Sequence, residues 1–294
     1  MGEELCSVLA ADEPLAGTAP FAIAWLVVEH PGPWGRDALT DSGLSQVLVD
    51  YIAAVQDAHP VRFLATRRID HARRRAADTG ARTVWLAHAD ASGGWLRRTQ
   101  VDRLEEIVDF DLEALSRGEV PDVGVQQFEP VEFVCTHSRR DTCCAILGRD
   151  HIATVPARQR DDVWECSHLG GHRFAATSLF LPSARVYGRL PARSTGSRFP
   201  EEPHPRHLRG STYLPAPLQV AECAIRIHAE LTPSDVVTVT QVGADESSVV
   251  ADVAAGDRVW IVRCTAEAFT SPASCGAESA TRRSWRAEVL SERN

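Results

Sequence analysis

The segment from Cys135 to His172 constrains this chain more than any other. It opens with Cys135, Cys143 and Cys144 and closes with His168 and His172, which are separated only by Leu-Gly-Gly. Thiolates and imidazoles are the donors that zinc, copper and iron–sulfur clusters prefer. We therefore expect the fold to bring the two ends of this segment together, with the remaining residues serving as its scaffold.

Composition and charge narrow the class of protein. The 294 residues, 44% hydrophobic and 24% charged, are typical of a globular protein with two domains and a small third piece. No apolar run is long enough to cross a bilayer, and acidic residues stand where an export signal would carry positive charge. A net charge of −9 opposes nucleic-acid binding. We expect a cytoplasmic protein with reduced cysteines and with neither a membrane nor a nucleic-acid partner.

Four further cysteines, Cys6, Cys223, Cys264 and Cys275, are scattered singly along the chain. Free cysteine is among the most frequently buried residue types and packs like a small hydrophobic side chain. We interpret these four as core residues and assign them no chemistry.

Residues 1–125 are predicted to form an α/β layered domain. Hydrophobic patterning indicates strands at Phe21–Glu29, Val61–Arg67, Arg82–His88 and Gly94–Gln100, and helices over about Ser42–His59 and Val101–Arg117. This part contains neither GxGxxG nor GxxxxGK[ST], so no nucleotide site is proposed.

Residues 126–212 are predicted to have a thioredoxin-like layout. The pattern indicates a strand at Pro130–Val134, a helix from Asp141 to Val155, a strand from Val163, a strand at Arg173–Leu181 and a hairpin partner at Arg185–Leu190. Asp141 can cap the helix, which places Cys143 and Cys144 in its first turn, where the helix dipole favours thiolate. Residues 191–213, rich in Pro, Gly and Arg, are expected to be a loop or lid.

Residues 213–294 are predicted to form a small β-rich segment. A helix is expected over about Ala216–Glu230. Alternating apolar and polar residues then indicate antiparallel strands at Val236–Gln241, Ser247–Val253, Arg258–Cys264 and Arg283–Leu290. The fold class is therefore α/β, with an N-terminal layered domain, a thioredoxin-like domain and this C-terminal segment.

The donors Cys135, Cys144, His168 and His172 are compatible with three kinds of site. The first is a [2Fe–2S] cluster, in which imidazole in place of thiolate makes the cluster less negative and raises its potential. The second is a structural zinc ion, for which two Cys and two His are equally good donors. The third has no metal and uses Cys143 or Cys144 as a thiol activated by the helix.

Spacing favours the iron–sulfur site. Zinc sites usually place cysteines two to four residues apart, whereas eight residues separate Cys135 from Cys144. So long a loop can wrap a larger inorganic core. The adjacent pair Cys143-Cys144 is not a CxxC redox motif, which weakens the thiol interpretation.

A Rieske-like ligand set is a further alternative. Cys135-Thr136-His137 and Cys166-Ser167-His168 are two C-x-H pairs. The second Rieske pair has C-x-x-H spacing, however, so this set matches less well.

The sequence resembles the sucrase/ferredoxin-like family of thioredoxin-like ferredoxins in two segments, Cys135–Cys144 (CTHSRRDTCC) and His168–Ala175 (HLGGHRFA). The hairpin from Leu181 to Gly188 and the N-terminal stretches 15–20 (LAGTAP) and 29–36 (EHPGPWGR) are similar to that family as well. The resemblance extends over most of the chain, and the HxGGH element is its most specific part.

The resemblance implies a thioredoxin-like ferredoxin domain that binds a [2Fe–2S] cluster through two Cys and two His. His168 and His172 match the family's histidines, and Cys135 matches its first cysteine. Cys144 matches the second cysteine, and the adjacent Cys143 stays open as a substitute. The word "sucrase" is a historical label, because the chain has no carboxylate pair at a glycosidase-like position.

We accordingly expect an electron carrier or redox component rather than a stand-alone enzyme. Imidazole ligands lose protons more easily on oxidation, so electron transfer is predicted to be proton-coupled, with a potential that falls as pH rises. Arg139, Arg140 and Arg173 border the site and either stabilise the reduced cluster, dock a partner or are simply solvated loop residues. The redox partner protein is unidentified, and homodimer formation stays open. A zinc-stabilised binding module and a metal-free thiol oxidoreductase are the alternative functions.

Overall fold

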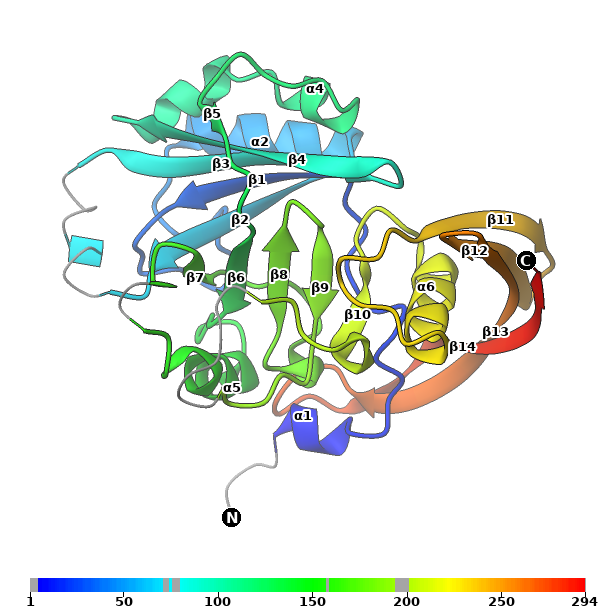
Figure 1. Ribbon diagram of the computed structural model, residues 1–294. Coiled ribbons are helices and arrows are strands. Elements are labelled where there is room, and N and C mark those ends of the chain that lie inside the picture. The colour runs from blue at the N-terminus through cyan, green and yellow to red at the C-terminus, as the bar shows by residue number, and fades with distance from the viewer. Residues whose placement is uncertain (1–4, 71–73, 76–79, 157–158, 194–200, 294) are drawn as a thin grey trace.

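The structure is a computed structural model that describes residues 5–70, 74–75, 80–156, 159–193 and 201–293. Two β-sheets form its framework (Figure 1). In this part of the chain, ten strands form a mixed sheet in the order β10-β9-β8-β6-β7-β2-β1-β3-β4-β5. Four more strands form an antiparallel sheet in the order β11-β12-β13-β14. Helices pack against both sheets (Figure 1), so the fold is broadly α/β.

The strands of the large sheet are β1 (Ala24–Glu29), β2 (Val61–Arg68), β3 (Arg82–Asp90), β4 (Gly93–Val101), β5 (Val125–Gln126), β6 (Val131–Cys135), β7 (Val163–Cys166), β8 (Ser178–Leu181), β9 (Arg185–Tyr187) and β10 (Leu208–Ser211). Those of the small sheet are β11 (Thr238–Ala244), β12 (Ser248–Ala255), β13 (Arg258–Pro272) and β14 (Ser279–Arg293). The α-helices are α1 (Cys6–Leu9), α2 (Gln46–Ala58), α4 (Leu112–Ser116), α5 (Thr142–Ile152) and α6 (Ala216–His228). Short 3-10 helices are η1 (Leu104–Asp109), η3 (His172–Phe174) and η4 (Pro205–His207).

The large sheet contains the same arrangement twice. In the first half, β1 and β2 are parallel and joined through α2, β3 pairs antiparallel with β1, and β4 follows β3 as a hairpin. In the second half, β6 and β7 are parallel and joined through α5, β8 pairs antiparallel with β6, and β9 follows as a hairpin. This second unit has the strand–helix–strand–hairpin order on which the thioredoxin-like prediction rests.

The two halves join where β2 and β7 pair antiparallel at their carboxyl ends, with Thr66 opposite Cys166. The loops that follow β1 and β6 therefore meet. The His137 Nε2 atom lies 2.7 Å from the Gly35 carbonyl oxygen, and the Trp34 ring packs edge-on against the His137 ring. Strands expected in separate domains thus share one sheet, and the proposed domain boundaries stay a prediction.

Three segments differ from the sequence-based expectations. The helix expected over Val101–Arg117 is interrupted at extended Phe110, and Asp111 starts α4 by accepting the Ala114 amide. The strand expected over Arg173–Leu181 starts only at Ser178, because η3 occupies its first residues. In the predicted loop 191–213, residues 208–211 form β10, which pairs with β9, while residues 194–200 lie outside the described part of the chain.

The small sheet curls around α6, and its last two strands are much longer than predicted (Figure 1). The pairing of β13 with β14 continues to Pro272 opposite Ser279. The turn between them, residues 273–278, reaches back to the large sheet, where the Cys275 amide donates to the Asp141 carboxylate. The C-terminal segment therefore contributes to the surroundings of the central Cys/His segment. None of the described helices is long and apolar enough to span a membrane.

Candidate metal centre

Cys135 is the last residue of β6, a strand buried along its whole length between β7 and β8. The next residue is also held in place. The hydroxyl of this residue, Thr136, donates to the buried Glu165 carboxylate at 2.7 Å, and Arg67 donates to the same carboxylate at 2.7 Å. The Arg67 guanidinium and the Thr136 hydrogen bond lower the pKa of Glu165 against the opposing effect of burial, which is the largest influence. The polypeptide leaving Cys135 is therefore fixed by a buried, charged anchor.

Cys144 is presented by the first turn of α5. Asp141 caps this helix by accepting the Cys143 amide at 2.8 Å, as the sequence predicts. Consecutive residues on a helix point about 100° apart, so Cys143 and Cys144 face different surroundings. Cys144 points into the core that contains Cys135, whereas Cys143 packs in a separate cluster with Cys6.

Three of the four predicted ligands converge on one point. The His168 Nδ1 atom lies 3.9 Å from both the Cys135 and the Cys144 sulfur, and the three donor atoms all lie within 4.8 Å of one another. The fourth predicted ligand is adjacent, because the His172 Nδ1 atom lies 3.3 Å from His168 Nε2 and the two rings are stacked.

The hydrogen bonds of the histidines define their tautomers. The Ala273 carbonyl in the β13–β14 turn can only accept, so the His172 Nε2 atom that contacts it carries a proton. His172 Nδ1 is then an acceptor for His168 Nε2, which leaves His168 Nδ1 with a free lone pair facing the two sulfur atoms. Histidines that bind metals characteristically donate their second ring N–H to a carbonyl or carboxylate in this way.

The thiols of Cys135 and Cys144 have pKa values shifted in opposite directions. Hydrogen bonding from the Cys144 thiol, the largest influence, lowers the pKa of Cys135 well below its usual value against the opposing effect of burial. The same contact with Cys135, followed by burial, raises the pKa of Cys144 well above its usual value. A cysteine must lose its proton to bind a metal ion. Cys135 is thus prepared as a thiolate, and binding at Cys144 requires a metal that displaces its proton.

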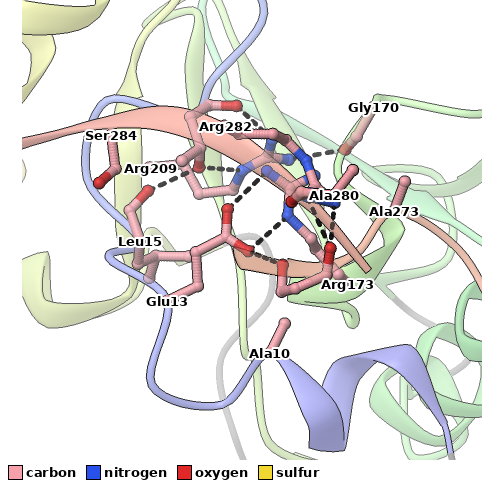
Figure 2. A network of polar contacts seen from close by, with 12 residues as sticks. Ala10, Glu13, Leu15, Gly170, Arg173, Arg209, Ala273, Ala280, Arg282 and Ser284 are labelled. Carbon is pink, nitrogen blue, oxygen red and sulfur yellow. Dashed lines mark hydrogen bonds and ion pairs between the residues drawn. The ribbon is translucent and has the colours of Figure 1, made fainter. Parts of the chain in front are cut away.

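A buried arginine supports the loop that carries the histidines, residues 168–172. Arg209 of β10 is 1% exposed and donates to the Gly170 carbonyl at 2.9 Å and to the Thr18 hydroxyl at 3.0 Å (Figure 2). Gly171 has φ +69°, and a Cβ there would lie 2.5 Å from an Arg209 nitrogen. The second glycine of HxGGH is therefore required by both its backbone conformation and the close approach of Arg209.

Around Arg209, a polar network joins the N-terminal segment to the C-terminal hairpin (Figure 2). Arg173, next to His172, makes two hydrogen bonds of 2.8 Å to the Glu13 carboxylate. The Ser271 hydroxyl donates to Glu13 at 2.6 Å, and Arg282 donates to the Ser271 carbonyl at 2.8 Å. Arg173 is thus part of this buried network rather than a free surface charge.

The charge of Arg209 has no acidic partner among the described residues, since every oxygen it contacts there is a hydroxyl or a carbonyl. Burial lowers the pKa of Arg209 to about 9, while Cys135 and Cys144 oppose this shift. Buried charges are normally paired or coordinate a metal. The unpaired guanidinium therefore fits a centre whose thiolates supply negative charge, and the donor set fits a metal that accepts sulfur and nitrogen.

The centre borders a polar cavity of about 270 Å³ on its histidine side. Its lining includes His168, His137 and three arginines, Arg36, Arg62 and Arg140. Cys135 and Cys144 are buried, so His168 is the donor that faces this cavity.

The structure separates the remaining candidates from the centre. Cys143, the sequence alternative to Cys144, belongs to a different donor group with Cys6, Asp141 and Cys275. The Rieske-like alternative is not assembled among the described residues, because His137 contacts Gly35 and only Cys135 and His168 of that set share a donor group. Sequence reasoning missed Arg209, which lay in the predicted loop, and no local pattern marks it.

A glycine sets the distance between α5 and β6. A Cβ at Gly148 would lie 2.1 Å from the Cys135 carbonyl oxygen. We expect Gly148→Ala to push α5 away from β6 and to lower the free energy of unfolding by about 1–3 kcal/mol, as overpacking does. Urea denaturation measures this change. Gly243→Ala, where the nearest atom is Val250 Cβ at 3.8 Å, is the matched control and should change stability little. Equal stability of both variants would contradict the tight α5–β6 contact.

Comparison with known proteins identifies the family. The model of the sucrase/ferredoxin-like family matches residues 15–198, which is more than half of the chain and includes all four predicted ligands. The chain belongs to this family. A search of curated proteins and a search of solved structures each found no match. The family name points to a redox or electron-transfer role, and the structure adds groups of Cys and His side chains able to bind metal.

Proposed function

We propose that this protein is an electron carrier that binds a [2Fe–2S] cluster through Cys135, Cys144, His168 and His172. The observation that carries the proposal is the convergence of both sulfur atoms on His168 Nδ1, with His172 stacked against His168. When bound, such a cluster supplies one-electron redox chemistry at a potential raised by its imidazole ligands.

The protein's own residues suit this role. Arg209 places a buried positive charge beside the centre, which favours the more negative, reduced state. His168 borders the cavity lined by Arg36, Arg62 and Arg140, so a redox partner would exchange electrons with the centre from this imidazole side. The arginines there would attract an acidic surface of a redox partner. The proton coupling expected for histidine ligation stays a prediction, as does the cytoplasmic location.

A single tetrahedral ion is the second candidate, and one observation favours it. Tetrahedral zinc with sulfur and nitrogen ligands separates those atoms by about 3.6 Å, and His168 Nδ1 is 3.9 Å from each sulfur. His172 would then orient His168 rather than bind metal. In a two-iron site, by contrast, His172 would itself be one of the residues that hold iron. A thiol enzyme is disfavoured, because Cys143 and Cys144, the two thiols considered for that role, are almost completely buried.

Metal and sulfide analysis of protein purified without air tests the proposal. We expect about two iron and two sulfide per chain and a reddish-brown colour that bleaches on reduction. His172→Ala separates the candidates further. It should destroy the colour if His172 binds iron, and should leave a zinc ion in place if His172 only orients His168. Colourless protein that contains zinc at this centre would contradict the electron-carrier proposal.

A further inference from the structure

Three cysteines and one aspartate meet in a second group outside the centre described above. The Cys143 sulfur lies 3.5 Å from the Cys6 sulfur and 3.3 Å from the Cys275 sulfur. The Asp141 Oδ1 atom lies 3.3 Å from the Cys275 sulfur and 3.9 Å from the Cys6 sulfur. All four donor atoms lie within 4.8 Å of one another.

These residues come from three distant parts of the chain. Cys6 begins α1, Asp141 and Cys143 form the start of α5, and Cys275 lies in the β13–β14 turn. Cys6, Asp141 and Cys143 are buried, and Cys275 is partly exposed. Thiols this far apart in sequence do not cluster because of a local pattern, so their convergence is a property of the folded protein.

We propose that Cys6, Cys143, Cys275 and Asp141 bind one structural zinc ion. Zinc–sulfur bonds of about 2.3 Å and zinc–oxygen bonds of about 2.1 Å give tetrahedral edges of about 3.8 Å between sulfurs and about 3.6 Å between sulfur and oxygen. The observed separations of 3.3–3.5 Å and 3.3–3.9 Å lie close to these values. Four protein donors complete the tetrahedron, which is characteristic of a structural rather than a catalytic site.

The surroundings of Asp141 complete the site. Its Oδ2 atom accepts the Cys275 amide at 3.0 Å, which fixes the carboxylate while Oδ1 faces the sulfurs. Disulfide bonding is a poorer explanation. Three thiols cannot all pair with one another, and both measured sulfur separations are well above the bond length of about 2.05 Å.

The zinc ion joins the parts of the protein that frame the first centre. Cys143 is adjacent to Cys144, and Cys275 lies two residues after Ala273, whose carbonyl contacts His172. The N-terminal segment that begins at Cys6 continues to Glu13, the partner of Arg173. The site therefore fastens the C-terminal hairpin and the segment that starts at Cys6 over the histidine loop.

Metal analysis of full-length protein tests this assignment. After dialysis against a mild chelator, we expect one zinc ion per chain in the native protein and loss of at least nine-tenths of it in Cys275→Ala and in Cys6→Ala. Cys264→Ala is the matched control, because Cys264 is buried in the same hairpin but outside the donor group. It should retain its zinc. Iron and visible absorption, if present in the native protein, should persist in all three variants.

Several results would overturn the assignment. They are native protein without zinc, an intact mass lowered by two hydrogens that reveals a disulfide, or a Cys275→Ala variant that keeps its zinc. Zinc that survives Cys275→Ala and Cys6→Ala but disappears in Cys144→Ser belongs to the first centre, and that result contradicts both proposals. If the native protein contains one zinc ion and no iron, and the zinc is lost in Cys275→Ala, the zinc assignment holds and only the cluster proposal is refuted.

Discussion

Replacement of Cys144 by serine is expected to remove iron and colour from the protein, whereas the same replacement of its neighbour Cys143 is expected to preserve both. The sulfur of Cys144 lies with Cys135 and His168, and that of Cys143 lies with Cys6 and Cys275. Serine is a poor ligand for an iron that prefers thiolate, so the loss at Cys144 should be nearly complete. The sequence alone left the choice between these adjacent cysteines open.

The measurements are iron, acid-labile sulfide and zinc per chain, with visible spectra recorded without air. The two variants are controls for each other, because the substitution is identical and the positions are consecutive in one helical turn. Iron retained in Cys144→Ser and lost in Cys143→Ser would show that the ligand set is wrong. Loss of iron from both variants would indicate that the start of α5 fails to fold, and circular dichroism would then reveal the lost helix.

The parts of the centre that sequence could predict depend on short-range patterns. The apolar stretch before Cys135 predicts β6, and Asp141 three residues before Cys144 predicts a helix cap. HxGGH predicts two histidines on one tight loop. Strand direction and helix start then bring Cys135 and Cys144 together, because both residues lie where β6 gives way to α5.

The remainder depends on contacts between residues far apart in the sequence. Cys6 and Cys275 are separated by almost the whole chain, and the sequence analysis interpreted both as core residues without chemistry. Arg209 acts through the carbonyl of Gly170, a contact that no periodicity encodes. The error at Val101–Arg117 is of a different kind. Local propensity predicts one helix there, but the extended Phe110 interrupts it and Asp111 caps a second helix.

Arg209 is the residue whose replacement should change the properties of the proposed redox centre most. Reduction adds one negative charge to the centre, and a buried cation nearby stabilises that charge. A unit charge about 10 Å from a redox centre contributes about 1.7 kcal/mol at an effective dielectric constant of about 20. That energy corresponds to about 70 mV for a one-electron couple. We therefore expect Arg209→Met to lower the reduction potential by about 50–100 mV.

Voltammetry on Arg209→Met and Arg209→Lys measures this effect, with iron content determined for each variant. The lysine variant keeps the positive charge but loses the fork of donors that binds Gly170 and Thr18. If charge dominates, Arg209→Lys should remain near the native potential while Arg209→Met falls. If support of the histidine loop dominates, both variants should lose iron to a similar extent. An iron-loaded Arg209→Met variant with an unchanged or higher potential would contradict the electrostatic role, because removal of a buried cation can only disfavour the added electron.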